Sequence, residues 1–386
     1  MSITVFNTLL IVSVALDLLV AGAVLLRPWP SAERTSPRKI GFARFVLALS
    51  LIAVLLVGRG LIVWPVTRSE FAAMRVVYVT LVVSLPLIGA GLLALAVRGR
   101  LLQRRYQVSW AVRASGFLML MFAPLGAYAT FVEPFQLVLE TVEVKLAPAR
   151  EGDRPVRIAV LADLQTNHIT DYEVGAVEQL LTLEPHVILL PGDVFHGTAE
   201  EFSRERSALR GLLSRLDAPG GVYLVKGNTD VPSRLAAAIE GTSVILLDNE
   251  LAATEVEGRR LVIGGIGFDY RTAQAQAVID QLELAEGDED VRILMAHTPD
   301  AVRVLRPNTR VDLLVAGHTH GGQVVIPFFG PPLTYSKLPR HIAGGGLHEL
   351  EGRRVYVSRG VGCERGLGPR VRFLCPPEIT LLVLEN

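Results

Sequence analysis

The sequence predicts an α/β domain over residues 136–386, preceded by an all-α transmembrane region over residues 1–135. Three observations point to this division. Four apolar runs lie within the first 132 residues. The remainder alternates between strand-like and helix-like segments, which is typical of a sheet with parallel strands. The charge divides at the same place, because residues 1–132 sum to +10 and residues 133–386 to −10 in a chain of zero net charge. Half of the residues are hydrophobic, which excludes a disordered or collagen-like chain.

Each apolar run is close to the roughly 20 residues that a helix needs to cross a bilayer. The runs are Thr8–Leu26, Phe45–Trp64, Val76–Val97 and Ala114–Val132. Short Arg-rich loops separate them, which favours membrane helices over buried core helices. No basic segment precedes the first run, so we interpret it as a retained helix rather than a cleaved signal peptide. We therefore expect a four-helix, multi-pass anchor in the cell membrane.

Basic residues predict the orientation of this anchor. The first and third loops, with their helix edges (residues 27–44 and 98–113), hold five basic residues each, against three over residues 59–75. Positive charge is retained on the cytoplasmic side, so we expect both termini and the second domain to be extracytoplasmic. Asp17 and Arg59 lie within apolar runs. We favour an interhelix contact for Asp17 and snorkelling of Arg59 to the interface, because no second acid or His suggests a relay.

Residues 136–386 contain the segments of the predicted sheet. A strand is expected from Gln136 to about Leu146, where the residues alternate, and ligands are expected outside the carboxyl ends of the parallel strands. The predicted helices are Tyr172–Leu181 and Glu200–Leu216. Further strands are predicted at Val156–Ala162, His186–Leu190, Gly221–Val225, Val244–Leu247, Arg260–Ile266, Val291–Ala296, Val311–Ala316, Arg353–Ser358 and Glu378–Leu384.

Six side chains of the types that bind metals follow predicted strands. They are Asp163, Asp193, Asn228, His297, His318 and His320. One Asp after a strand is more often a turn former, but six such residues in matching positions indicate one site at the sheet edge. Oxygen and imidazole ligands together suit Mn, Fe or Zn. Two such ions, bridged by a carboxylate, can clamp the attacking and leaving oxygens of a phosphoryl transfer.

The same residues form an ordered set of motifs that resembles the calcineurin-like metallophosphoesterases. The set is Asp163-Leu-Gln165, Gly192-Asp193, Gly227-Asn228-Thr229-Asp230, His297 and Gly317-His318-Thr319-His320. The resemblance covers about Arg157 to Leu384, and residues 321–323, 357–360 and 376–379 are similar to a bacterial, often membrane-attached branch. It implies a four-layer fold with two facing β-sheets flanked by helices.

The resemblance also implies two metal positions that share Asp193 as a bridge. The first would be held by Asp163, Gln165, Asp193 and His320, and the second by Asp193, Asn228, His297 and His318. Gln165 stands where the family usually has His, so the first position would be weaker or would prefer a harder ion, and Mn is favoured. Thr229 stands where the family has the His that stabilises the leaving group. His168 or His196 could supply that imidazole, and the alternative for each is a solvated loop His.

Three other features carry narrower expectations. Arg359 is a candidate phosphate clamp because its planar fork matches phosphate oxygens, and the alternative is a surface salt bridge. Asn167 is a candidate substrate contact. Cys363 and Cys375 could form a disulfide if the domain is extracytoplasmic, and free thiols are expected if it is cytoplasmic.

These features favour a membrane-anchored, dinuclear metal-dependent phosphohydrolase. A metal-bound hydroxide would cleave phosphoester or pyrophosphate bonds, with Asn228, His318, Arg359, His168 and His196 as candidate catalytic residues. Lipid-linked or small phosphorylated substrates fit the anchor. The acidic domain has no basic stripe with interleaved aromatics, so we expect no nucleic-acid partner. The alternative is a degenerate domain acting as a membrane-bound binding or sensing module. A transporter is favoured least, because the spans show no paired charges.

Overall fold

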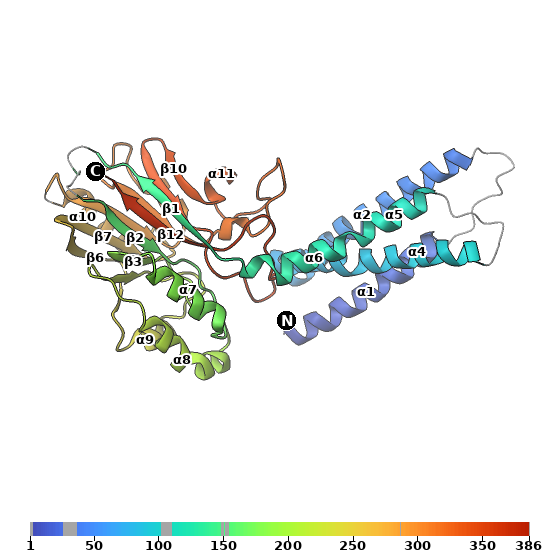
Figure 1. The fold of residues 1–386 in the computed structure, drawn as a ribbon, viewed down its shortest axis with the longest axis horizontal. Coiled ribbons are helices and arrows are strands. Elements are labelled where there is room, and N and C mark those ends of the chain that lie inside the picture. Colours follow the sequence, from blue (N-terminus) through green and yellow to red (C-terminus); the bar gives the residue numbers. More distant parts are fainter. Residues whose placement is uncertain are drawn as a thin grey trace. The chain divides into compact units, whose positions relative to one another are not determined.

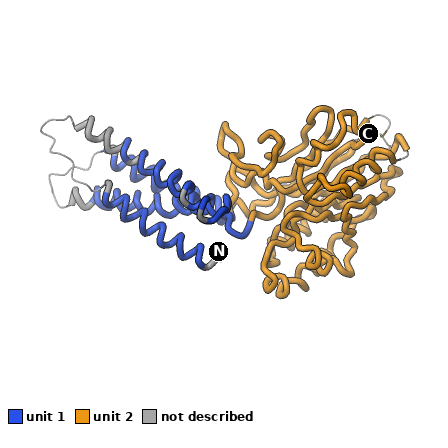
Figure 2. The backbone as a smooth tube through the Cα atoms, turned by 180° about the vertical axis from the view of Figure 1, so that it is seen from behind, with its two compact units in different colours: residues 1–131, 365–370 blue, residues 132–364, 371–386 orange. Residues whose placement is uncertain are grey.

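The computed structural model describes residues 3–25, 37–101, 110–147, 150, 154–285 and 287–385. The chain divides into two compact units (Figure 2). The first comprises residues 1–131 and 365–370, and the second comprises residues 132–364 and 371–386. Figure 1 shows that the first unit is helical and that the second contains the sheets.

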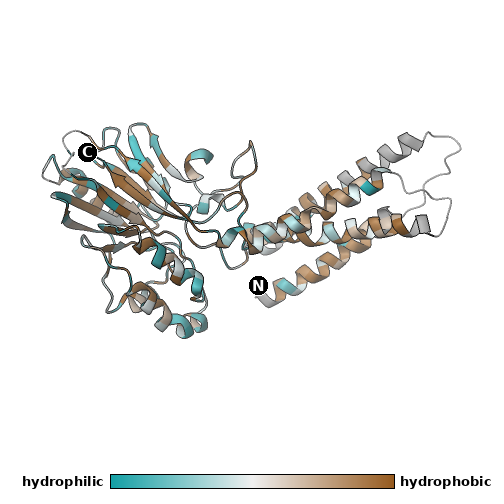
Figure 3. Ribbon diagram, viewed as in Figure 1, coloured by the Kyte–Doolittle hydropathy of each residue, from teal (hydrophilic) through white to brown (hydrophobic). Residues whose placement is uncertain are grey.

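The first unit consists of apolar helices, which Figure 3 draws largely in the colour of hydrophobic residues. They are α1 (Ile3–Leu25), α2 (Pro37–Thr67), α3 (Glu70–Val79), the π-helical turn η2 (Thr80–Ser84), α4 (Leu85–Leu101), α5 (Trp110–Leu120) and α6 (Phe122–Phe131). In the described residues, three segments are long and apolar enough to cross a membrane, namely Val5–Ala23, Glu70–Val97 and Val112–Phe135. The apolar part of α2, Ser50–Pro65, is shorter, so three of the four predicted spans are supported and the count of four stays a prediction.

The two charges within the apolar runs bind each other. Nη2 of Arg59 lies 2.7 Å from Oδ1 of the buried Asp17, which joins α2 to α1. Ser84 donates to the other oxygen of Asp17 at 2.6 Å, and Arg59 donates to the Ser13 hydroxyl at 2.6 Å. The interhelix contact expected for Asp17 is confirmed, whereas snorkelling of Arg59 is wrong. The expectation that the spans hold no paired charge is also wrong, because a charge within apolar helices is stabilised by an opposite charge and hydroxyls.

The second unit contains two six-stranded sheets. The first has the order β1 (Val138–Val144), β12 (Glu378–Leu384), β2 (Val156–Val160), β3 (Val187–Leu190), β4 (Val222–Leu224), β5 (Val244–Leu246). The second has the order β10 (Gly346–Leu350), β11 (Arg353–Val357), β9 (Leu313–Ala316), β8 (Val291–Ala296), β7 (Arg259–Ile266), β6 (Glu250–Val256). Runs of parallel strands form the centre of each sheet, but β2–β12, β6–β7 and β10–β11 pair antiparallel, so the sheets are mixed rather than parallel throughout.

Alternation along the buried strands builds the layers. In β3, Val187 and Leu189 join an inner core that also contains Ile293 of β8, so the sheets face each other. Ile188 of β3 points the other way, into a core with Leu209 of α8. A strand buried on both faces reads as one continuous apolar run, which is why β3 was recognisable in the sequence.

Helices cover the outer faces of both sheets (Figure 1). The first sheet is covered by α7 (Asp171–Leu181), α8 (Ala199–Leu213) and α9 (Pro232–Ile239). The second is covered by α10 (Ala273–Leu284) and the short α11 (Arg340–Ala343). Two facing sheets between helices agree with the predicted four-layer α/β fold. The sequence analysis missed β6, β10, α9, α10 and the short α11. The edge strands β6 and β10 are only partly buried and lack an apolar run.

Candidate metal centre

The loops after strands of both sheets bring the predicted metal ligands together. Asp163 and Gln165 follow β2, Asp193 follows β3, Asn228 follows β4, His297 follows β8, and His318 and His320 follow β9. Backbone hydrogen bonds join neighbouring loops, such as Gln165 N–H to Asp193 carbonyl (2.7 Å) and Gly317 N–H to His297 carbonyl (3.1 Å). Asp163, Asp193 and His297 are buried, with one ligand atom of each lying within 4.8 Å of the others. A shared site at the carboxyl ends of the strands is therefore present in the fold.

His297 and Asn228 present two acceptor atoms to one point. Nδ1 of His297 lies 2.7 Å from the carbonyl of Pro191, which can only accept, so the ring carries its proton on that nitrogen. Burial lowers the pKa of His297 to about 4, and Nε2 is therefore an unprotonated acceptor at neutral pH. The amide is placed so that Oδ1 of Asn228 lies 2.9 Å from Nε2. Two facing acceptors repel each other, and a cation held by both residues would remove that repulsion.

Asp193 occupies the middle of the cluster. Its Oδ1 accepts the backbone N–H of Thr229 at 2.8 Å. Its Oδ2 lies 3.3 Å from Nε2 of Gln165 and 3.5 Å from Nε2 of His297. The carboxylate thus lies between one residue expected at the first metal position and one expected at the second, as a bridging ligand would.

Asp163, His318 and His320 complete the set. Both carboxylate oxygens of Asp163 accept the backbone N–H of His318, at 3.1 and 2.9 Å. The rings of His318 and His297 are 5.0 Å apart. Nδ1 of the buried His320 has no hydrogen-bond partner in the described part of the chain. A buried imidazole nitrogen without a partner is costly, and ligation would satisfy it.

The electrostatics of the cluster also call for cations. Burial and the nearby Asp193 raise the pKa of Asp163 well above its usual value. Burial raises the pKa of Asp193 as well, and burial with the proximity of His297 lowers the pKa of His318 to about 4. Close, buried carboxylates repel each other when ionised, while the imidazoles stay neutral and free to ligate. The donor set therefore fits divalent metal ions.

The ligands are held by strained backbone. Five candidate ligands have positive φ: Asp163 (48°), Gln165 (41°), Asp193 (55°), His318 (72°) and His320 (49°). This conformation costs roughly 1–3 kcal/mol per residue and persists where the surroundings over-determine it, typically at functional sites. Strain concentrated on the ligands themselves is consistent with a backbone arranged for the site rather than for stability.

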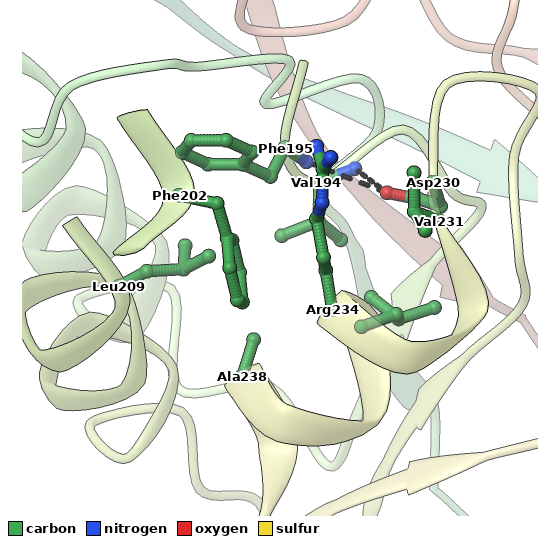
Figure 4. A pocket seen from close by; sticks show the side chains of 9 residues that line it. Val194, Phe195, Phe202, Leu209, Asp230, Val231, Arg234 and Ala238 are labelled. Atoms are coloured by element: carbon green, nitrogen blue, oxygen red, sulfur yellow. Dashed lines mark hydrogen bonds between the residues drawn. The ribbon is translucent and has the colours of Figure 1, made fainter. Parts of the chain in front are cut away.

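Asp230 is the residue whose role the sequence did not reveal. Its carboxylate accepts backbone N–H groups from Asp193 (2.8 Å), Val194 (2.9 Å), Phe195 (3.4 Å) and Gly227 (2.9 Å). Figure 4 shows two of these bonds at the edge of a small pocket between α8 and α9. Asp230 therefore holds the loop that carries Asp193 against the loop that carries Asn228.

Gly227 allows these two loops to meet. A Cβ atom at this position would lie 2.0 Å from Oδ1 of Asp193. Gly227→Ala is therefore expected to displace Asp193 and to lower the affinity for Mn²⁺ about ten- to a hundredfold, as lost outer-shell support does. Titration of the metal-free protein with Mn²⁺, followed by thermal unfolding, measures this. The control is Gly211→Ala in α8, where a Cβ meets nothing within 4 Å. Equal Mn²⁺ affinity in both variants would contradict the prediction.

The two candidate histidines differ in their surroundings. Nδ1 of His168 lies 2.8 Å from Oε1 of Glu205, and its side chain is 67% exposed. Nδ1 of His196 lies 3.4 Å from Nε2 of Gln165 and 3.8 Å from Oε1 of Glu364. The structure therefore places His196, and not His168, beside a candidate ligand. The catalytic role of either residue stays a prediction.

Arg359 forms ion pairs within the domain. Its Nη2 lies 2.6 Å from Oε2 of the buried Glu378 and also bonds Glu140. The salt bridge that was the alternative to a phosphate contact is present, although its partner Glu378 is buried rather than at the surface. The phosphate contact stays a prediction. Asn167 donates to Glu201 at 2.8 Å.

The C-terminal loop supplies residues that the sequence analysis did not single out. Oε2 of Glu364 lies 3.4 Å from Nε2 of Gln165, and Gln323 accepts the backbone N–H of Glu364. The fully buried Arg372 donates to the carbonyls of Arg359, Gly360, Gly362 and Cys375. Cys363 and Cys375 are buried free thiols, so the disulfide alternative is absent from the structure. Glu364 contacts Gln165 and Gln323 from 199 and 41 positions away, whereas the partners of Arg372 lie within 13 positions of it. No local sequence pattern marked either set of contacts.

Comparison with known proteins identifies the domain. The model of the calcineurin-like phosphoesterase family matches residues 156–322, the segment that carries all of the candidate metal ligands. This part of the chain is a calcineurin-like phosphoesterase domain. The protein is accordingly a metal-dependent phosphoester hydrolase.

The relatives of this calcineurin-like phosphoesterase extend beyond the matched segment. Phosphodiesterase YaeI of Escherichia coli is 28% identical over 64% of this chain and 88% of that protein. The uncharacterised metallophosphoesterase YkuE of Bacillus subtilis is 26% identical over 70% of this chain and 96% of that protein. Among solved structures, the NAD nucleotidase NadN of Haemophilus influenzae aligns with a TM-score of 0.38 at 13% identity, over 56% of this chain and 46% of that chain.

Proposed function

We propose that this protein is a membrane-anchored hydrolase with a dinuclear metal centre, acting on phosphoester or pyrophosphate bonds at a membrane surface. The position of Asp193 between Gln165 and His297 carries the proposal. The acidic, buried donor set supports two divalent ions, with Mn favoured because Gln165 offers an amide oxygen where imidazole is usual. The three apolar candidate spans support the anchor, and an anchor favours lipid-linked phosphates among the substrates. The name of the relative YaeI favours a phosphodiester.

We assign the residues to the two proposed positions as the family resemblance implies. Asp163, Gln165, Asp193 and His320 would hold one ion, and Asp193, Asn228, His297 and His318 the other. Bound ions would supply positive charge to the phosphoryl oxygens and would activate a water molecule. The chain itself orients the donors: Pro191 sets the tautomer of His297, and Asp230 holds the loops of Asp193 and Asn228.

The test uses the full chain in detergent or nanodiscs, stripped of metal by a chelator. Hydrolysis of bis(p-nitrophenyl) phosphate should be absent, and Mn²⁺ should restore it. Monoester and pyrophosphate panels define the bond that is cleaved. Asn228→Ala and His318→Ala should abolish turnover and reduce the bound Mn measured by mass spectrometry. Absence of both metal uptake and hydrolysis would instead support the alternative of a degenerate domain that binds or senses a ligand, which Gln165 and Thr229 favour.

His196 is the candidate for the imidazole that Thr229 lacks. We expect His196→Ala to lower kcat most for substrates with poor leaving groups, because a proton donor contributes about a hundredfold or more to such a step. His168→Ala is the matched control, since that side chain is exposed and paired with Glu205. Rates with p-nitrophenyl and alkyl diesters distinguish the roles. Equal losses for both leaving groups in His196→Ala would argue against proton donation.

The proposed orientation has its own measurement. The basic loops predict that the hydrolase domain is extracytoplasmic. Alkaline phosphatase fused after residue 386 should be active if the domain is extracytoplasmic. Green fluorescent protein fused at the same place should then not fluoresce. Fluorescence of the second fusion would reverse the orientation without affecting the assignment of the metal centre.

A further inference from the structure

An apolar loop follows directly on the metal-binding segment. The loop comprises residues 324–335, which follow His320 and Gln323 in the sequence. Phe328 is fully exposed, Phe329 is more than half exposed, and Ile326 is nearly half exposed. Leu333 and Tyr335 are exposed as well. A contiguous exposed apolar patch is unusual on a soluble domain and marks an interaction surface.

The loop is preformed rather than loosely extended. Ile326 donates its N–H to the Gly330 carbonyl at 3.1 Å, and Gly330 donates back to Ile326 at 2.9 Å. The base is tied by Val325, whose N–H bonds the Phe373 carbonyl at 2.8 Å. Phe328 holds a φ of 66° at the tip, a conformation that is an outlier for a bulky residue. The strained turn thus carries an exposed aromatic ring at its tip.

The composition of the loop suits an environment without water. Prolines at positions 327, 331 and 332 have no backbone N–H. The turn between Ile326 and Gly330 pairs further backbone groups internally. Unpaired backbone N–H groups are the main obstacle to entering lipid, and this loop has few such groups.

Positive charge flanks the loop. No Asp or Glu occurs from residue 321 to residue 348, within a region whose net charge is −10 over residues 133–386. Lys337, Arg340 and His341 are exposed in this stretch. The guanidinium of Arg340 lies 4.6 Å from the ring centroid of Phe329. Aromatic side chains beside basic ones are typical of segments that lie at the interface of an anionic bilayer.

We propose that the apolar loop inserts into the surface of an anionic lipid bilayer, with Phe328 and Phe329 among the lipids and Lys337 and Arg340 on the phosphates. The bilayer is the occupant that the chain itself supplies, since it carries three candidate membrane spans. The proposal rests on the membrane attachment in the proposed function and deepens it.

The loop is coupled to the metal centre by packing. A Cβ atom on Gly322 would lie 2.5 Å from Cβ of Pro331 and 2.7 Å from the carbonyl of Leu333. The returning limb of the loop therefore rests on the residue two positions after His320. Insertion of the tip would hold the metal-binding segment at the lipid surface, which selects phosphates displayed at that surface as the substrate class.

A spin label at the tip tests the insertion directly. Phe328→Cys in the full chain is labelled with a nitroxide and reconstituted in vesicles of phosphatidylcholine and phosphatidylglycerol. The native Cys363 and Cys375 are buried, and unmodified protein controls for their labelling. Leu284→Cys is the matched control, because Leu284 is an exposed apolar residue elsewhere in the same unit. Power saturation compares access of oxygen, which concentrates in lipid, with access of a water-soluble nickel chelate.

The label at residue 328 should be more accessible to oxygen than to the nickel chelate. The label at residue 284 should be more accessible to the nickel chelate. Omission of phosphatidylglycerol, or the double change Lys337→Gln with Arg340→Gln, should make the label at 328 more accessible to nickel. Equal nickel access at both sites in vesicles would overturn the proposal. The same result is expected if the loop binds a protein partner instead of lipid. Because the readout does not use catalysis, a failure here is distinct from a failure of the proposed activity.

Discussion

Asp193→Asn is expected to abolish hydrolysis while raising the melting temperature of the metal-free protein. The carboxylate lies between the two proposed metal positions, so its loss should lower Mn²⁺-dependent kcat/KM at least about a hundredfold, the upper range for lost outer-shell support. Without metal, Asp193 is a buried charge beside others: its proximity adds to burial in raising the pKa of Asp163. Asparagine keeps the acceptor for Thr229 and removes this repulsion.

The pH dependence gives the sign of the stability effect. Burial raises the pKa of Asp193 above its usual 3.8 in the folded protein. The folded protein therefore binds the proton more tightly than the unfolded chain, and stability is lost as the pH rises through the folded pKa. The gain from Asp193→Asn should be small in acid and should grow toward neutral pH. Thermal unfolding of metal-free protein, followed by circular dichroism, measures this.

Asn228→Ala is the matched comparison for Asp193→Asn. It removes a neutral ligand, so it should lose activity without stabilising the metal-free protein. If Asp193→Asn retained hydrolysis, the bridging assignment would fail. If it lost hydrolysis but lowered the melting temperature at neutral pH, the repulsion argument would fail and the ligand assignment would stand.

Asp230→Asn is expected to weaken both the fold and the metal centre. The carboxylate accepts four backbone N–H groups, two on each oxygen. Asparagine would direct donors at two of them, and each buried unsatisfied donor costs about 1–3 kcal/mol. Release of the loops carrying Asp193 and Asn228 should lower Mn²⁺ affinity about ten- to a hundredfold. Denaturant unfolding gives the stability, and Mn²⁺ titration gives the affinity.

Asp312→Asn separates these two effects. Asp312 is a buried carboxylate that accepts the backbone N–H of Arg292 at 2.8 Å and pairs with Arg150. This variant should lose stability in the same way but should keep its Mn²⁺ affinity once folded. Unchanged affinity in Asp230→Asn would show that Asp230 supports only the fold.

The metal-binding motifs were predictable because each depends on local sequence. An apolar run followed by Asp, Asn or His predicts a strand and the residue at its carboxyl end, and parallel strands bring such ends to one edge. Asp163, Asp193 and Asn228 follow strands of the first sheet, so they could be assigned to one edge. His297 follows a strand of the second sheet, so its place near Asp163 depends on the facing of the two sheets. The resemblance of the motifs to a family then supplied the four-layer arrangement.

The particular partners of Arg359, Asp230 and Arg59 were not predictable. Nothing near Arg359 in the sequence indicates Glu140 as its partner, and an Asp after Asn228 gives no sign that it accepts four N–H groups. Arg59 was expected to reach the interface by itself, because its distance from Asp17 depends on how α1 and α2 pack. Edge strands such as β6 were not predicted, because about half of their residues are polar.

The sequence by itself determined most of the strands, the helices α7 and α8, the apolar segments, and which residues of metal-binding type follow β2, β3, β4, β8 and β9. Hydrophobic periodicity and residue chemistry are properties of short segments, so no folded structure is needed to recognise them. The tertiary structure alone decided which groups satisfy each other: Asp230 with the ligand loops, Arg359 with Glu378, Asp17 with Arg59. Burial makes unpaired polar groups costly, and only the complete packing determines where each partner comes from.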